Sequence, residues 1–253
     1  MRPYLLIAAL LLSGCAVFKK RAAGPASVPK RPAALLDASS PRLLIEVDYI
    51  EGYAPKPGAI ALLQKRLELY LDKPGGITIV LDEALPADVW DGRANTIGRL
   101  IYTHASPPGD GTAYIYAISG PHYKKYRGMS YQPGVIRGVD FPAMALFKDK
   151  IPGILWVTRA RQEGAVLLHE VGHLVGLVSN DAHRDGGHCT NAWCLMYNGV
   201  DWRSGLIYAL PTLFAGQIPT KFCRDCRQDL WGDEPLPGQR VPVTPEVPQT
   251  HSM

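Results

Sequence analysis

The stretch RQEGAVLLHEVGHLVGL, at residues 161–177, constrains the fold and chemistry of this chain more than any other. Its residues are mostly good helix formers, so we expect a helix here. His169 and His173 are four positions apart, and a helix therefore places both imidazoles on one face, about one turn apart. Two imidazoles at this spacing can bind one tetrahedral zinc ion.

Glu170 lies between these histidines and is rotated by about 100° from His169 around the helix axis. It is therefore poorly placed to be a third ligand on the same face. A carboxylate beside a zinc-bound water can instead take the proton of that water, which is the role of a general base. The stretch predicts a zinc-dependent hydrolase with Glu170 as its base.

A third zinc ligand should follow the helix, because Gly176 offers a place for the chain to turn back. No glutamate occurs between Glu170 and Glu234, which disfavours a gluzincin-like glutamate ligand. Histidines are instead concentrated here, since four of the seven in the chain lie between positions 169 and 188. His188 is the favoured third ligand and His183 is its rival. A carboxylate ligand is a less favoured alternative, with candidates at Asp181, Asp185 and Asp201.

The downstream motifs resemble those of the archaemetzincins, also called archaelysins, a family of metzincin zinc peptidases. In that family H-E-x-x-H-x-x-G leads to His-Cys-x4-Cys-x-Met and then to C-x-x-C, and this chain has the same order through His188, Met196 and its cysteines. The resemblance covers roughly residues 165–230. The chain departs from this family in two places. The segment between Gly176 and His188 is longer, and the position at which the plain metzincin pattern has its third histidine is Ser179 here. The segment between Met196 and Cys223 is also longer than in typical members.

The resemblance implies a role for each matching residue. His169, His173 and His188 would bind the catalytic zinc, and Glu170 would be the base. Met196 would form the Met-turn, in which a thioether lies beneath the histidines without binding the metal. The fold implied is α+β and metzincin-like, with a mixed twisted sheet, an active-site helix and a small irregular C-terminal lobe. The substrate implied is a peptide or protein.

Four cysteines follow the active-site helix, at positions 189, 194, 223 and 226. We expect a helix over 220–230 that carries Cys223 and Cys226 on one face. The family resemblance implies a second, structural zinc held by the four thiolates. An oxidising compartment would favour disulfides instead, Cys189–Cys194 and Cys223–Cys226 or cross-pairs.

The N-terminus has the features of a bacterial lipoprotein signal peptide. Arg2 precedes an apolar run from Tyr4 to Leu12, and the sequence Leu-Ser-Gly-Cys ends at Cys15. We expect cleavage before Cys15, acylation of its thiol, and anchoring in the bacterial cell envelope, with the outer membrane favoured. Residues 16–40 would form a flexible basic tether, and the Pro-rich residues 233–253 a disordered tail.

The segment 41–232 is expected to be a single catalytic domain, with an N-lobe at 41–177 and a C-lobe at 178–232. Residues 42–50 read as a strand, 59–71 as an amphipathic helix and 77–81 as a second strand, which together predict a βαβ unit. Residues 113–118 and 153–158 are further strand candidates. The strand at 113–118 is interpreted either as an internal strand or as an edge strand that pairs with a peptide substrate.

Charge and hydropathy exclude other classes of function. The net charge is +4, but six basic residues precede the first acidic residue, Asp37, so the rest of the chain is close to neutral. A basic surface for nucleic acid is therefore not expected. Two alternatives to a peptidase stay open, namely a zinc amidohydrolase acting on a non-peptide amide and a non-catalytic, zinc-stabilised lipoprotein that binds peptides.

Overall fold

The computed structural model describes residues 32–109, 111–151, 157–178, 181–197 and 218–240. Its centre is a five-stranded sheet in the order β2-β1-β3-β5-β4. The strands are β1 (Arg42–Ile50), β2 (Ile77–Leu85), β3 (Thr112–Gly120), β4 (Gly128–Tyr131) and β5 (Ala143–Phe147). All neighbouring strands are parallel except β4 and β5, which are antiparallel. The sheet is therefore mixed, as the sequence predicts.

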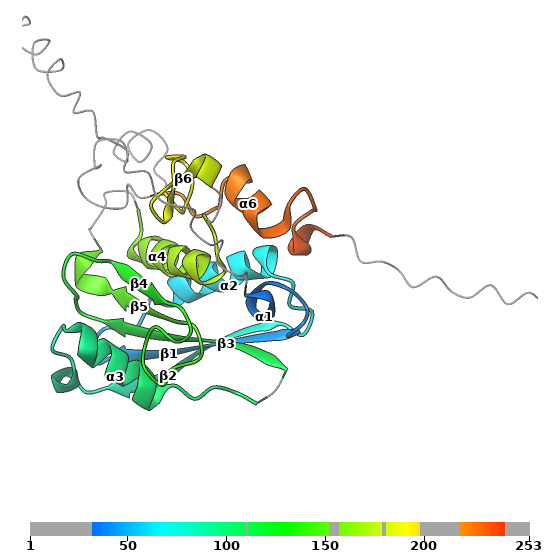
Figure 1. Ribbon diagram of the computed structural model, residues 1–253. Coiled ribbons are helices and arrows are strands. Elements are labelled where there is room, and N and C mark those ends of the chain that lie inside the picture. Colours follow the sequence, from blue (N-terminus) through cyan, green and yellow to red (C-terminus); the bar gives the residue numbers. More distant parts are fainter. Residues whose placement is uncertain (1–31, 110, 152–156, 179–180, 198–217, 241–253) are drawn as a thin grey trace, which may run out of the picture.

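Helices cover both faces of this sheet (Figure 1). On one face lie α2 (Pro57–Tyr70) and α4 (Arg159–Leu174), and on the other lies α3 (Ala94–His104). Side chains along β1 alternate between the faces, so that Ile45 and Val47 pack towards α2 and α4. Ile50 packs with the side chains of α3. This division into two apolar layers is typical of a sheet covered on both sides.

The predicted βαβ unit is confirmed, because α2 connects β1 to its parallel neighbour β2. Pro57 begins α2, where a missing N–H costs nothing. The strand predicted at 113–118 is β3, and it lies between β1 and β5 in the middle of the sheet. Its interpretation as a substrate-pairing edge strand is therefore wrong, and the internal reading holds. Among the described strands, β2 and β4 lie at the edges of the sheet.

Several elements differ from the sequence expectation. Of the strand candidate at 153–158, residues 153–156 lie outside the described residues, and Thr158 is the N-cap of α4. The helix α3 and the strands β4 and β5 were not predicted. Both strands are short and follow a Gly- and Pro-rich stretch, which hides strand periodicity.

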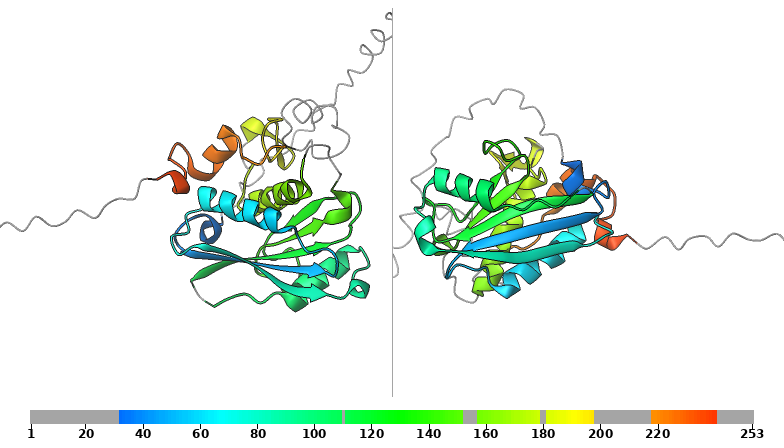
Figure 2. Two further views of the ribbon diagram at one scale, coloured as in Figure 1. Left: turned by 180° about the vertical axis from the view of Figure 1, so that it is seen from behind. Right: turned by 90° about the horizontal axis from the view of Figure 1, so that it is seen from below.

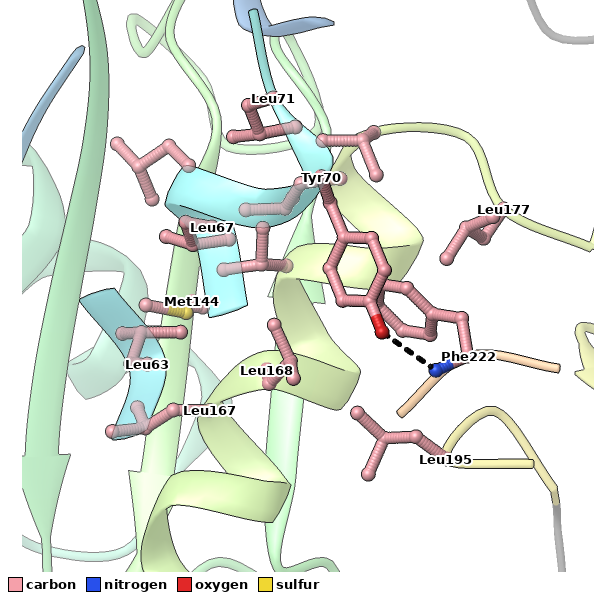
Figure 3. Packing of buried hydrophobic residues seen from close by; sticks show 14 of the residues in the cluster. Leu63, Leu67, Tyr70, Leu71, Met144, Leu167, Leu168, Leu177, Leu195 and Phe222 are labelled. Atoms are coloured by element: carbon pink, nitrogen blue, oxygen red, sulfur yellow. Dashed lines mark hydrogen bonds between the residues drawn. The ribbon is translucent and has the colours of Figure 1, made fainter. Parts of the chain in front are cut away.

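The C-terminal segments extend the same core rather than forming a second one. They comprise η3 (Asp181–His183), the hairpin β6 (Arg184–Asp185) and β7 (His188–Cys189), α6 (Arg224–Trp231) and η6 (Pro237–Gln239). Figure 3 shows Phe222 against Tyr70 of α2, with ring centroids 4.7 Å apart. The backbone N–H of Phe222 donates to the Tyr70 hydroxyl at 3.3 Å. Leu195 belongs to the same buried cluster as Phe222 and Tyr70.

The packed structure reaches beyond the predicted domain bounds at both ends. The short helix α1 (Ala33–Leu36), within the predicted tether, buries two leucines, and Lys73 donates to three carbonyl oxygens of residues 34–40. In the predicted disordered tail, Leu236 is 5% exposed, and Arg240 pairs with Asp72. The described parts of these segments, residues 32–40 and 233–240, both contact Asp72 just after α2. Figure 2 shows them on the same side of the molecule.

None of the helices within the described ranges combines the length and hydropathy that a membrane-spanning segment requires. The predicted signal peptide and Cys15 lie outside the described residues.

Candidate metal centre

The helix α4 holds the first two histidines of the site. It begins after Thr158, whose side-chain oxygen accepts a hydrogen bond from the Arg161 N–H at 3.2 Å, and it ends at Leu174. Gly176 then takes a positive φ of 80°, and the chain turns away. His169 and His173 share one face, with ring centroids 4.8 Å apart and Nε2 atoms 3.1 Å apart. The predicted spacing therefore produces the predicted juxtaposition.

His188 joins this pair from the hairpin β6–β7. Its ring centroid lies 5.2 Å from that of His169 and 5.0 Å from that of His173. One nitrogen from each of the three rings lies within 4.8 Å of the other two. The tertiary structure thus brings together three imidazoles, two from one helix and one from a hairpin.

The chemistry of this donor set fits zinc. The Nδ1 of His169 lies 2.8 Å from the Leu195 carbonyl oxygen. A carbonyl only accepts, so Nδ1 carries the proton and Nε2 presents its lone pair. Burial lowers the pKa of His169 to about 4 and that of His173 to about 3, which keeps both rings neutral. Three imidazole ligands leave a fourth tetrahedral position open, as in catalytic zinc sites.

His183, the rival ligand, is placed elsewhere. It is 7% exposed, and its Nε2 lies 3.0 Å from Oδ2 of Asp229 in α6. His183 therefore connects the loop after α4 to α6 and does not join the three-histidine group. Asp185 lies outside that group too, and Asp201 is outside the described residues. Asp181 begins η3.

The side chain of Glu170 lies against the edge strand β4. It is 7% exposed, and burial raises its pKa to about 8, although a hydrogen bond with the Ser130 side chain partly opposes this shift. Gly128 leaves the room that the carboxylate occupies, since a Cβ there would lie 2.5 Å from Glu170 Oε1. The carboxylate is thus held between α4 and β4.

The strand β4 is fixed to α4 at its other end as well. Gln132, just after β4, donates from Nε2 to the His173 carbonyl oxygen at 2.9 Å. Among the described residues β4 pairs only with β5, so no described strand pairs with its other edge. Gly128, Ser130 and Gln132 were missed by the sequence analysis. Their signal was weak, because a four-residue strand among glycines and prolines resembles a loop.

Met196 lies directly against the segment between the two helical histidines. It is fully buried, and a Cβ placed on Gly172 would lie only 2.4 Å from its sulfur. A glycine inside a helix is otherwise unfavourable by about 1 kcal/mol. Gly172 is therefore explained by the close approach of the Met196 thioether.

This contact makes Gly172→Ala informative. The added methyl group must displace either the Met196 sulfur or α4, and overpacking of this kind costs about 1–3 kcal/mol. We expect a lower Tm and faster loss of bound metal to a chelator, measured by calorimetry and by metal analysis. Gly58→Ala, at the first turn of α2, is a milder comparison because its Cβ would be 3.1 Å from Ala160 Cβ. Equal effects of the two changes would contradict a special role for the Met196 contact.

The four cysteines form a second group of potential ligands. One sulfur from each of Cys189, Cys194, Cys223 and Cys226 lies within 4.8 Å of the others. All four are free thiols, and the sulfurs of Cys189–Cys223 and Cys194–Cys226 are 3.7 and 3.6 Å apart. A disulfide would require about 2.05 Å. The structure therefore contains none of the disulfides considered as alternatives.

Backbone N–H groups surround these sulfurs. Those of Asn191, Met196 and Cys223 donate to cysteine sulfurs at 3.3–3.4 Å. Hydrogen bonds from Cys194 and Cys226 lower the pKa of the Cys223 thiol, whereas burial raises the pKa of Cys189, and hydrogen bonds among the sulfurs raise the pKa of Cys194 and Cys226. N–H donors favour the thiolate, which is the form that binds zinc. Four convergent sulfurs with such donors fit a tetrahedral structural zinc site.

Comparison with known proteins gave structural matches only. No family profile matches the chain, and no curated protein matches it. The archaemetzincin of Methanopyrus kandleri shares 16% identity and a TM-score of 0.49, over 76% of this chain and 94% of its own. Metalloproteinase-II of Bacteroides fragilis shares 14% identity with a TM-score of 0.46, and the match covers 77% of this chain and 53% of that protein's chain. The archaemetzincin of Archaeoglobus fulgidus, complexed with malonate, shares 16% identity with a TM-score of 0.37, and the match covers 72% of this chain and 97% of that protein's chain.

Proposed function

We propose that this chain is a zinc-dependent metallopeptidase of the archaemetzincin-like type. The observation that carries the proposal is the convergence of His169, His173 and His188 on one point, next to a buried glutamate on the same helix. The three imidazoles would hold a zinc ion. When bound, this ion would act as a Lewis acid that polarises a substrate carbonyl and lowers the pKa of a water molecule.

The protein's own groups then have defined tasks. Glu170 accepts a proton from the attacking water and returns it to the leaving amine, for which a raised pKa is favourable. The Ser130 hydroxyl and Gly128 orient the carboxylate. The Leu195 carbonyl fixes the ring of His169, and the Gln132 side chain fixes the end of α4.

The substrate is proposed to be an extended peptide lying along β4. That strand offers an edge not paired within the sheet, and its neighbouring helix carries the glutamate and two of the histidines. A peptide that adds a strand to such an edge gains backbone hydrogen bonds, whatever its side chains. The edge next to the candidate site is therefore β4 and not β3.

Digestion of a peptide library by the zinc-loaded full chain tests this function. We expect internal or terminal peptide-bond cleavage that stops when zinc is removed and returns when it is added. Cleavage of small non-peptide amides alone would indicate an amidohydrolase. Binding of peptides without turnover of either class would indicate a non-catalytic protein.

Metal stoichiometry separates the two sites. We propose that the four cysteines hold a structural zinc, so the chain should bind about two zinc ions. His188→Ala should reduce the content by about one ion, whereas His183→Ala should leave both sites occupied and lower Tm, because Asp229 loses its buried partner. Elemental analysis with calorimetry measures both. Loss of one zinc in His183→Ala but not in His188→Ala would reverse the ligand assignment.

We also propose that Cys15 carries the lipid anchor, which places the chain in a bacterial cell envelope. The proposal rests on the charged start, the apolar run and the Leu-Ser-Gly-Cys sequence. Expression with a labelled fatty acid should yield a labelled protein in the membrane fraction. Cys15→Ser should abolish the label, whereas Cys189→Ser should retain it, since the sulfur of Cys189 belongs to the buried cluster.

A further inference from the structure

A second group of ionisable side chains lies on the face of the sheet opposite to α4. Glu46 and Asp48 of β1 are 4% and 1% exposed. They alternate with Ile45 and Val47, which face α2 and α4, so the two carboxylates point into the layer shared with α3. Two buried carboxylates two residues apart on one strand have no part in the proposed peptidase site.

An irregularity in the sheet adds two more carboxylates. The register between β1 and β2 pairs Val47 with Leu81 and then Tyr49 with Ala84, so that two residues of β2 oppose the single residue Asp48. Those two residues are Asp82 and Glu83. β-bulges of this kind redirect side chains at sheet edges. The Glu83 N–H donates to Asp48 Oδ1 at 3.0 Å, which fixes the bulge against the buried carboxylate.

Tyrosine hydroxyls hold the two buried carboxylates in place. Tyr114 donates to Glu46 Oε2 at 2.6 Å, and Tyr116 donates to Asp48 Oδ2 at 2.7 Å. The Ser106 N–H also donates to Glu46 Oε2. The other oxygen of Glu46, Oε1, is buried and has no hydrogen-bond partner among the described residues. A buried carboxylate oxygen without a partner is costly unless a cation neutralises it.

Among the described residues, no lysine or arginine acts on Glu46 or Asp48 strongly enough to influence its pKa. Among the ion pairs of lysine and arginine that the structure describes, none involves Glu46, Asp48 or Asp82. Burial and the neighbouring carboxylates raise the pKa of both Glu46 and Asp48, as expected for like charges held together. Within the described part of the chain, no lysine or arginine ion pair therefore offsets the negative charge of Glu46, Asp48 and Asp82.

We propose that Glu46, Asp48 and Asp82 form a binding site for an oxygen-preferring divalent cation, for which Ca²⁺ is the natural probe. One oxygen from each of these residues lies within 4.8 Å of the others. Carboxylate oxygens are the ligands that Ca²⁺ takes, with waters completing its coordination. Exposed Asp82 leaves the site open to solvent, so a cation can enter without unfolding.

Glu83 and His104 border the site. The His104 Nδ1 lies 2.9 Å from Glu83 Oε2, and one donor atom from each of Asp48, Glu83 and His104 also lies within 4.8 Å of the others. This pair connects the bulge of β2 to the end of α3. A bound cation would thus link β1, β2 and α3, and would stabilise the edge of the sheet farthest from β4.

Calorimetric titration of the zinc-loaded full chain with Ca²⁺ tests the proposal. We expect one Ca²⁺ per chain, and Tm should rise by roughly 5–10 °C at a free concentration about 100 times Kd. Asp48→Asn should weaken binding at least about tenfold, since it removes a charged ligand. It should also raise Tm in the absence of Ca²⁺, because it relieves repulsion from Glu46 and Asp82. The zinc content should not change.

Asp82→Asn is a second variant at an exposed position and should also weaken Ca²⁺ binding without affecting folding. Asp88→Asn, exposed in η1 (Ala87–Val89), is the matched control and should bind Ca²⁺ like the unmodified chain. Absence of Ca²⁺ binding to the unmodified chain would overturn the proposal. So would equal Ca²⁺ affinity in Asp82→Asn and Asp88→Asn.

Discussion

Glu170→Gln is expected to reduce kcat for peptide cleavage by about 10²–10⁴-fold, the usual contribution of a general base. Glutamine keeps the size of the side chain and can still accept the hydrogen bond from Ser130, but it cannot take a proton from water. The zinc content should be unchanged, because the group of potential zinc ligands consists of three histidines and Glu170 is not part of it. Steady-state kinetics with elemental analysis measures both quantities.

The stability of this variant provides an internal check. Burial raises the pKa of Glu170 above its ordinary value to about 8, so the ionised carboxylate destabilises the folded state once the pH exceeds the ordinary pKa. Glutamine removes that cost, and the free energy of unfolding at neutral pH should therefore be unchanged or higher. Glu68→Gln, at an exposed position of α2, is the control. An unchanged kcat in Glu170→Gln would remove the base assignment.

Glu163→Ala is expected to lower the free energy of unfolding by about 3–5 kcal/mol, the usual cost of removing one partner of a buried ion pair. Glu163 is fully buried in α4, with Oε1 3.2 Å from Lys148 Nζ and 3.6 Å from Arg159 Nε. Its other oxygen accepts the Lys56 N–H at 2.7 Å, directly before α2. Alanine would leave the buried ammonium of Lys148 without its counter-charge.

Urea unfolding of Glu163→Ala and of the exposed control Glu68→Ala measures this difference. The control loses only a hydrogen bond from Gln64 on the surface of α2, so its effect should be within about 0.5 kcal/mol. If both variants lost the same small amount, the ion pair would not be a main stabilising contact. A large loss confined to Glu163→Ala would show that this pair is a main contribution to the stability of the packing around α4.

The helical part of the site could be predicted from the sequence because its geometry is local. A spacing of four residues fixes His169 and His173 on one face of any helix, and the adjacent Glu170 must then point elsewhere. The βαβ unit was predictable for the same reason, since a strand, a helix and a second strand are each visible as periodic patterns. The strands β4 and β5 are too short, and lie too close to glycines and prolines, to show such a pattern.

The long-range contacts of the site could not be predicted in this way. The sequence left both His183 and His188 as third ligands, and only folding of the segment after α4 separates them, with His183 paired to Asp229 and His188 beside the other two rings. It also left the cysteines open between disulfides and a shared site. Their grouping depends on how α6 packs against the hairpin, which local spacing does not encode.

The sequence by itself determined the chemistry available to this protein: two imidazoles and a carboxylate in fixed order on a helix, and a supply of further histidines and cysteines downstream. The tertiary structure alone decided which of these groups meet, that Glu170 is buried against β4, and that Glu46, Asp48 and Asp82 converge at a bulge. The physical reason is the distance along the chain over which each kind of interaction acts. Helical periodicity acts over a few residues, whereas contacts between segments depend on the packing of the whole core.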